Sequence, residues 1–139
     1  QTMMIENPTV LYVEDDALSR EIMLLLLVEE MGLTHVTVFS DSSDFVARVQ
    51  SLLPPPDVIL LDIHVKPYGG FQMLALLRQQ DAFRTTRVVA LTASVMNEEI
   101  QQLKQAGFTS VLAKPIDQDI FPAQFARILN GEHLWRVVE

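Results

Sequence analysis

Four short apolar runs, each followed directly by polar or charged residues, constrain the fold of this chain more than any other feature. The runs and their followers are residues 10–13 with Glu14, Asp15 and Asp16, residues 58–61 with Asp62, residues 88–91 with Thr92, and residues 111–113 with Lys114. A strand in a parallel sheet is covered on both faces, so it is apolar along its length and reaches water at its carboxyl end. The pattern therefore predicts buried parallel strands with reactive side chains along one edge of the sheet.

Helix-like segments alternate with the strands. We expect strands at 9–13, 36–39, 58–61, 87–91 and 111–113, and helices at 17–31, from Asp41 or Ser42 to about 53, at 71–80, from an Asn97 cap to Gly107, and at 117–129. This alternation predicts an α/β fold, a doubly wound five-stranded parallel sheet with helices on both faces. Ligands of such sheets bind where the strand order reverses, so acids that follow the first and third strands are expected to converge.

The composition excludes several classes of function. The chain has 139 residues, enough for one domain, and no cysteine, which excludes disulfides, thiolate zinc sites and cysteine nucleophiles. Its net charge of -8 disfavours direct binding to nucleic acid. The longest apolar run, residues 22–28, is too short to span a membrane, and no secretory signal is recognisable at the amino end. We therefore expect a cytoplasmic protein.

The acidic run at 14–16 indicates a cation site. Neighbouring carboxylates repel one another unless a cation, water or helix amide groups offset their charge. Magnesium fits such a run because it is a hard ion that takes a few carboxylates together with phosphate oxygens and water. The alternative is structural, with Asp15 or Asp16 capping the first helix and Glu14 facing solvent. The acidic run alone leaves both interpretations open.

Asp62 is the predicted nucleophile of the site. An aspartate at the end of a fully apolar strand is costly to ionise without a partner, and a carboxylate beside a magnesium ion can attack phosphorus to form an acyl phosphate. Thr92 offers a hydroxyl donor and Lys114 a cation, which suit the remaining oxygens of that phosphate. The alternatives are that Asp62 caps the following turn and that Thr92 and Lys114 are each structural.

Four motifs in this order, LYVEDD, VILLD, VVALTA and VLAKP, resemble the receiver domain of two-component response regulators. The resemblance covers about residues 8–130, which leaves an N-terminal extension at 1–7 and a C-terminal tail at 131–139. It implies a flavodoxin-like sheet with the strand order 2-1-3-4-5. It also implies a phosphorylation switch rather than an enzyme, whose own catalysis is limited to self-phosphorylation from small donors and autodephosphorylation.

The resemblance also implies roles for individual residues. Asp62 is the phosphoacceptor, and it takes its phosphoryl group from a sensor histidine kinase or a phosphotransfer protein. Thr92 and Lys114 hold the phosphoryl oxygens. The switched surface then acts on a downstream effector protein or output domain. The tail, which contains Trp135, packs on the domain, mediates a homodimer, begins a connector to an output domain, or is loosely ordered.

The magnesium ligands implied by the resemblance are Glu14, Asp15, Asp62 and the backbone carbonyl of His64. Asp15 binds the ion directly and Glu14 binds it mainly through water. Many receivers carry an arginine six residues after the first acid of the pair, and counting back from Arg20 selects Glu14 and Asp15. Asp16 is then expected at the helix cap.

The chain departs from the family pattern at two places. Val65 and Lys66 occupy the positions where the family often has Met-Pro, with Pro67 one residue later, and Val111 replaces the aromatic residue usual three residues before the lysine. Coupling to the outer surface is then expected to depend on Thr92 and the loop into the fourth helix.

Two competing functions follow from the same residues. The first is a scaffold with the receiver fold that is never phosphorylated, and the retained charged cluster argues against it because a scaffold has no need of it. The second is a phosphatase of another doubly wound family, which would need a second acid two residues after Asp62, where His64 stands.

Overall fold

The computed structural model describes residues 6–135 and contains one five-stranded sheet in which every neighbouring pair of strands is parallel. The strand order is β2-β1-β3-β4-β5, as predicted. The strands are β1 at Thr9–Val13, β2 at His35–Phe39, β3 at Val58–Asp62, β4 at Arg87–Thr92 and β5 at Ser110–Ala113. The central strand β3 is buried at all five positions, which is why its sequence is apolar until Asp62.

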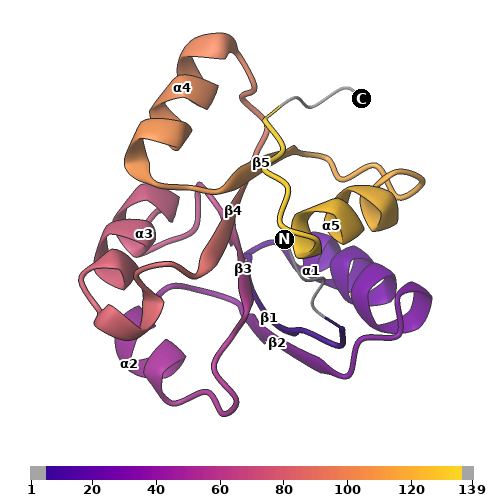
Figure 1. Cartoon of the computed structure of the whole chain (residues 1–139), viewed down its shortest axis with the longest axis horizontal. Coiled ribbons are helices and arrows are strands. Elements are labelled where there is room, and N and C mark those ends of the chain that lie inside the picture. The colour runs from indigo at the N-terminus through magenta and orange to yellow at the C-terminus, as the bar shows by residue number, and fades with distance from the viewer. Residues whose placement is uncertain (1–5, 136–139) are drawn as a thin grey trace.

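The helices form two layers, with α1 and α5 on one face of the sheet and α2, α3 and α4 on the other (Figure 1). The α-helices are α1 at Ala17–Leu24, α2 at Phe45–Gln50, α3 at Gly70–Arg78, α4 at Asn97–Ala106 and α5 at Phe121–Leu129. Each layer buries its own apolar cluster against the sheet. Alternate residues of β1 supply these two clusters: Leu11 and Val13 on one face, and Val10 and Tyr12 on the other.

The first helix is longer than α1 because it continues as a π-helix, η1, at Leu25–Glu30. The amide of Met31 donates to the carbonyl of Leu26, a spacing of five residues. Gly32 follows with φ of 71°, a left-handed conformation that glycine adopts without strain, and the helix ends there as predicted.

The predicted start of α2 at Asp41 or Ser42 is wrong. The helix begins at Phe45 after Asp44, whose φ is 47°, and it ends at Gln50 rather than near residue 53. Asp41 instead accepts from the amide and hydroxyl of Ser43, and Ser42 is buried in contact with a distant loop. Both candidate caps are therefore engaged elsewhere.

Two further helix starts differ from the expectation. Asn97 is the first residue of α4 rather than its cap, which is Met96. The helix α5 begins at Phe121 and not at Asp117, whose carbonyl accepts from the amide of Phe121 in a preceding turn. Pro122 explains the late start, because a residue without an N–H is accommodated in the first turn of a helix but not in its interior.

Gly69, which precedes α3, and Gly70, its first residue, lie close to the loop after β3. Neither Gly69 nor Gly70 has a positive φ. A Cβ atom on Gly70 would lie 2.6 Å from Ile63 Cδ1 and 3.0 Å from Ile63 Cα, and a Cβ on Gly69 would lie 3.0 Å from the carbonyl oxygen of Ile63. The loop after β3 therefore passes close to the start of α3, and a side chain at Gly70 would require Ile63 to move.

The tail packs on the domain as far as the structure describes it. The carbonyl of Leu134 accepts from the amide of Val111 at 2.8 Å, and the amide of Leu134 donates to Ser110 Oγ at 2.9 Å, so the tail lies along the outer edge of β5. Leu134 is 3% exposed, and Trp135 packs against the α4 side of the core. The tail residues 136–139 lie outside the described residues, as does most of the predicted extension at 1–7.

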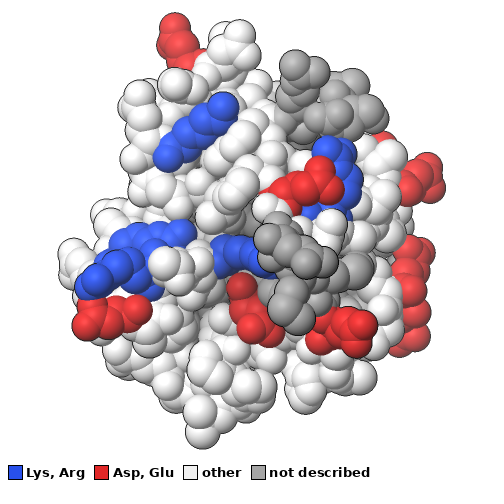
Figure 2. All heavy atoms as spheres, viewed as in Figure 1, with Lys and Arg blue, Asp and Glu red and all other residues white. Residues whose placement is uncertain are grey.

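Charged side chains are distributed over the surface. Figure 2 shows basic and acidic side chains scattered over this face among uncharged ones. Within residues 6–135, no helix has the length and apolar character needed to cross a bilayer.

Candidate functional site

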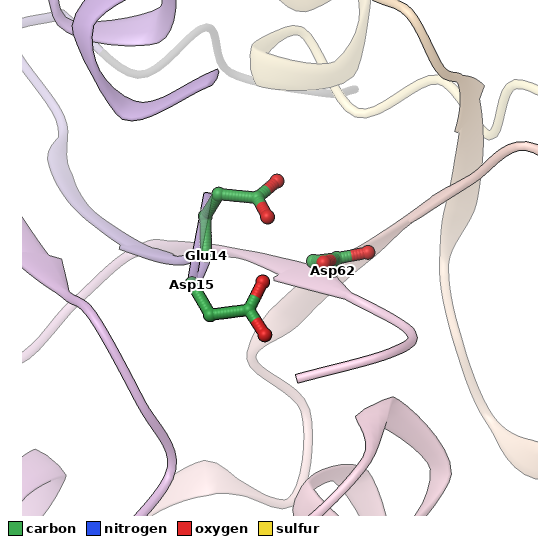
Figure 3. A group of neighbouring side chains, drawn as sticks. All are labelled: Glu14, Asp15 and Asp62. Atoms are coloured by element: carbon green, nitrogen blue, oxygen red, sulfur yellow. The ribbon is translucent and has the colours of Figure 1, made fainter. Parts of the chain in front are cut away.

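Three carboxylates meet at the carboxyl edge of the sheet. Glu14 and Asp15 follow β1, Asp62 ends β3, and one carboxylate oxygen from each lies within 4.8 Å of the others. Figure 3 shows the Glu14 and Asp15 side chains extending from the end of β1 toward the side on which Asp62 lies. The adjacent pairing of β1 and β3 creates this meeting point, because Val13 pairs with Leu61 and the next residues of both strands are the acids. Glu14 and Asp62 are buried and Asp15 is exposed.

Lys114 contacts two of the acids, Glu14 and Asp62. Its Nζ lies 2.9 Å from Glu14 Oε1 and 3.3 Å from Asp62 Oδ1, although it is separated from Glu14 by 100 residues in the sequence. Partial burial by itself disfavours the charged ammonium, but the hydrogen bond to Glu14 and the negative charges of Asp62 and Glu14 outweigh it and raise the pKa of Lys114. The Lys114–Pro115 peptide bond is cis.

Tyr12 is a site residue that the sequence analysis missed. Its hydroxyl donates to Glu14 Oε1 at 3.2 Å, and both side chains are 1% exposed. Burial first, and then the Glu14 charge, raise the pKa of Tyr12 far above its ordinary range. A signal was present in the sequence, because residues two apart in a strand share a face and a buried tyrosine hydroxyl needs a polar partner.

Glu14 is also held by two residues that follow it in the sequence. Its Oε2 accepts from the amide of Asp16 at 3.2 Å, and the guanidinium of Arg20 donates to its carbonyl oxygen at 3.0 Å. Asp16 stands apart from the cluster as the cap of α1, where it accepts from the amide and the hydroxyl of Ser19. Those hydrogen bonds lower the pKa of Asp16. Asp16 therefore caps the helix, as expected, while Glu14 and Asp15 lie in the carboxylate cluster.

Thr92 ends β4 beside the acid cluster. It is 4% exposed, and its hydroxyl oxygen accepts from the amide of Ser94 at 3.1 Å. Its carbonyl accepts from the amide of Lys114 at 2.9 Å, which fixes the ends of β4 and β5 together. The amide of His64 lies 3.4 Å from Asp62 Oδ1 in the loop after β3.

Ser42, in the loop before α2, holds the loop after β3 by hydrogen bonds. Ser42 Oγ donates to the carbonyl of Tyr68 at 2.7 Å and accepts from its amide at 2.6 Å, and the amide of Ser42 donates to the carbonyl of Lys66. Val65 in this loop is buried in the core. Two departures from the family pattern, Val65 and Lys66, thus lie in a loop that is held by three hydrogen bonds.

The donor set fits magnesium. The three acids offer hard oxygen ligands and no sulfur or imidazole nitrogen, which suits Mg²⁺ better than a transition metal. With the acids ionised and Lys114 charged, the cluster carries two negative charges in excess. A divalent cation would neutralise this excess.

The chain matches the family model for the response regulator receiver domain over residues 10–125. It is 32% identical over 111 residues to the signal transduction histidine-protein kinase BarA of Shigella flexneri, an alignment that covers 80% of the chain and 12% of the kinase. It is 31% identical over 109 residues to a nitrate/nitrite response regulator protein homolog of Haemophilus influenzae, covering 73% of the chain and 51% of that protein. The chain therefore spans only part of these two relatives.

Solved structures show the same architecture. The chemotaxis protein CheY4 of Vibrio cholerae aligns with a TM-score of 0.76 and 26% identity, covering 87% of this chain and 98% of CheY4. The receiver domain of the sensor histidine kinase PA1611 of Pseudomonas aeruginosa, solved with a magnesium ion coordinated in its active site cleft, aligns with a TM-score of 0.72 and 26% identity, covering 88% and 93%. The chain therefore belongs to the response regulator receiver domain family of two-component signalling systems.

Proposed function

We propose that this receiver domain accepts a phosphoryl group on Asp62 in a magnesium-dependent reaction and thereby switches a protein-interaction surface. The observation that carries the proposal is the arrangement around Asp62. Its buried carboxylate lies close to two further acids, which suit a divalent cation. It also lies close to the Lys114 ammonium group, which suits a phosphate. A merely structural aspartate needs no such surroundings.

The donor in this proposal is a phosphohistidine of a histidine kinase or phosphotransfer protein. An Asp62 carboxylate oxygen attacks phosphorus, a P–O bond forms, the P–N bond to histidine breaks, and the electron pair of that bond leaves with the imidazole. Bound magnesium, held by Asp15, Asp62, the backbone carbonyl of His64 and, through water, Glu14, would offset the charge between the carboxylate and the phosphoryl oxygens. Attack of water on the acyl phosphate then regenerates the Asp62 carboxylate and releases phosphate.

Lys114 and Thr92 complete the proposed phosphate side of the site. Lys114 already holds the Asp62 carboxylate at 3.3 Å, so its ammonium needs little movement to donate to a phosphoryl oxygen. Thr92 now accepts from the Ser94 amide, and its hydroxyl hydrogen is available as a donor. When that hydroxyl turns to the phosphoryl group, the 93–96 loop into α4 moves with it.

That loop is our proposed route to the outer surface. Val111 is fully buried, and its short side chain cannot swing between solvent and core as an aromatic ring would. Its amide donates to the carbonyl of Leu134. Met96, which precedes α4, is 68% exposed. Receiver domains interact with histidine kinases and output domains, and we propose that movement at the start of α4 changes binding to an effector, an output domain or a second copy in the cytoplasm. The proposed limits of the receiver domain are residues 8–130.

Intact mass measurement tests the proposal. We expect the chain, incubated with acetyl phosphate and Mg²⁺, to gain one phosphoryl group, and we expect no gain in the Asp62→Asn variant or with EDTA. Asp119→Asn is the matched control, since Asp119 is an exposed aspartate outside the acid cluster. If the chain gains no phosphoryl group, the scaffold function replaces the proposed one.

A further inference from the structure

The buried carboxylate of Glu14 is engaged by donors of this chain at both of its oxygens. Its Oε1 accepts from the Tyr12 hydroxyl at 3.2 Å and from Lys114 Nζ at 2.9 Å, and its Oε2 accepts from the amide of Asp16 at 3.2 Å. The residue is 1% exposed. Leaving a buried carboxylate oxygen without a donor is costly, so Glu14 loses stabilisation if it turns away from these donors to bind an ion directly.

Asp15, the next residue, is in a different situation. It is exposed to solvent and does not belong to the hydrogen-bond set around Glu14. Figure 3 shows the two carboxylates apart, with that of Glu14 above that of Asp15 in this view. Consecutive residues in extended backbone project to opposite sides, which accounts for the separation. Direct binding of a cation by Asp15 and Asp62 therefore costs none of the hydrogen bonds of Glu14.

Of the two donors to Glu14 Oε1, Tyr12 is the one that stays. Lys114 also contacts Asp62 at 3.3 Å, and in the proposed function its ammonium turns to a phosphoryl oxygen. Tyr12 lies in β1, and its ring is buried in the apolar cluster on the α1 and α5 face of the sheet. A ring packed in this way has little room to move, so its hydroxyl remains at the end of the strand. Tyr12 thus continues to hold Glu14 when Lys114 turns to phosphate.

We propose that Tyr12 is a positioning residue that sets the metal specificity of the site: its hydroxyl holds Glu14 back from direct coordination and so favours Mg²⁺ over Ca²⁺. The inference rests on the proposed function, in which Asp15 and Asp62 bind the ion directly and Glu14 binds it through water. Mg²⁺ demands near-octahedral geometry and keeps several waters, whereas Ca²⁺ takes more oxygen ligands at longer distances and in flexible geometry. A further direct carboxylate would therefore favour Ca²⁺.

Amide NMR titrations of the isotope-labelled chain with MgCl₂ and, separately, with CaCl₂ at constant ionic strength test the proposal. We expect the ratio of the Ca²⁺ Kd to the Mg²⁺ Kd to fall about fivefold in Tyr12→Phe, the effect of one hydrogen bond. The control Tyr68→Phe should leave the ratio unchanged, because Tyr68 is 40% exposed and lies outside the hydrogen-bond set of Glu14.

A double substitution tests whether Tyr12 acts through Glu14. The uncharged side chain of Glu14→Gln is a weak ligand for either ion, so adding Tyr12→Phe to that variant should change the ratio by less than about twofold. A purely structural tyrosine would weaken the binding of both ions equally and leave the ratio unchanged. Amide spectra of each variant without metal report whether it is folded.

Three results would overturn the inference: an unchanged ratio in Tyr12→Phe, an equal change in Tyr68→Phe, or an undiminished fall when Glu14 is already glutamine. Each of them leaves the proposed function standing, provided that the unaltered chain binds Mg²⁺ and gains its phosphoryl group. If the unaltered chain shows no saturable shifts with Mg²⁺, the proposed function fails and the inference fails with it.

Discussion

Replacing Tyr12 with phenylalanine removes one buried hydrogen bond from the candidate site and leaves the shape of the core unchanged. A hydrogen bond to a charged group contributes about 1.5–3 kcal/mol to stability. The Tyr12–Glu14 distance of 3.2 Å is long for a hydroxyl donor, and Glu14 Oε1 keeps its contact with Lys114 at 2.9 Å. We therefore expect a loss below that range, about 1 kcal/mol in the free energy of unfolding, or roughly 3 °C in Tm.

The effect of this substitution should depend on pH with a defined sign. Burial and the Glu14 carboxylate raise the pKa of Tyr12 above its ordinary value of 10.0. A raised folded-state pKa contributes stability that is present below the unfolded pKa and is lost as pH rises toward the folded one. Above pH 10 the unaltered chain should therefore lose about 1.4 kcal/mol per pH unit more than Tyr12→Phe does. The advantage of the tyrosine should disappear near pH 11.

Urea unfolding followed by circular dichroism at pH 8 and pH 11 measures both effects. Tyr68→Phe is the control, because Tyr68 is 40% exposed and its hydroxyl bonds to none of the described residues. We expect that variant to match the unaltered chain at pH 8. An equal effect of the two substitutions, or a Tyr12→Phe deficit that persists unchanged at pH 11, would refute the role assigned to the Tyr12 hydroxyl.

Three other predictions concern the tail, the loop after β3 and the acid cluster. Ser110→Ala leaves the Leu134 amide without its buried acceptor, so urea unfolding should show a loss of about 1–3 kcal/mol, with exposed Ser40→Ala as a neutral control. Gly70→Ala places a Cβ against Ile63 and should cost about 1–3 kcal/mol, and adding Ile63→Val should recover part of this loss because it removes Cδ1. Magnesium at about 100 times its Kd should raise the free energy of unfolding by about 2.7 kcal/mol, and EDTA should reverse this effect. The Asp15→Asn substitution should reduce the stabilisation more than the control substitution Asp44→Asn does. Full stabilisation of Asp15→Asn by magnesium would exclude that carboxylate as a ligand.

The sequence by itself determined the sheet and its reactive edge. An apolar run of four residues such as 58–61, bounded by polar residues, is typical of a strand covered on both faces, so the polar residue after it is expected at the carboxyl edge of the sheet. Parallel pairing then brings the followers of neighbouring strands together. For this reason the sequence alone predicts that Glu14, Asp15 and Asp62 are neighbours, as the structure has them.

Only the tertiary structure decided which groups those side chains bind. Ser42 has the residue type of a helix cap, but its hydroxyl bonds to Tyr68, because contacts from a distant loop outweigh a weak local preference. The contact from Lys114 to Glu14 spans 100 residues. The local sequence determines which polar residues lie at the carboxyl edge of the sheet. Their hydrogen-bond partners depend on packing between segments that are remote in the chain.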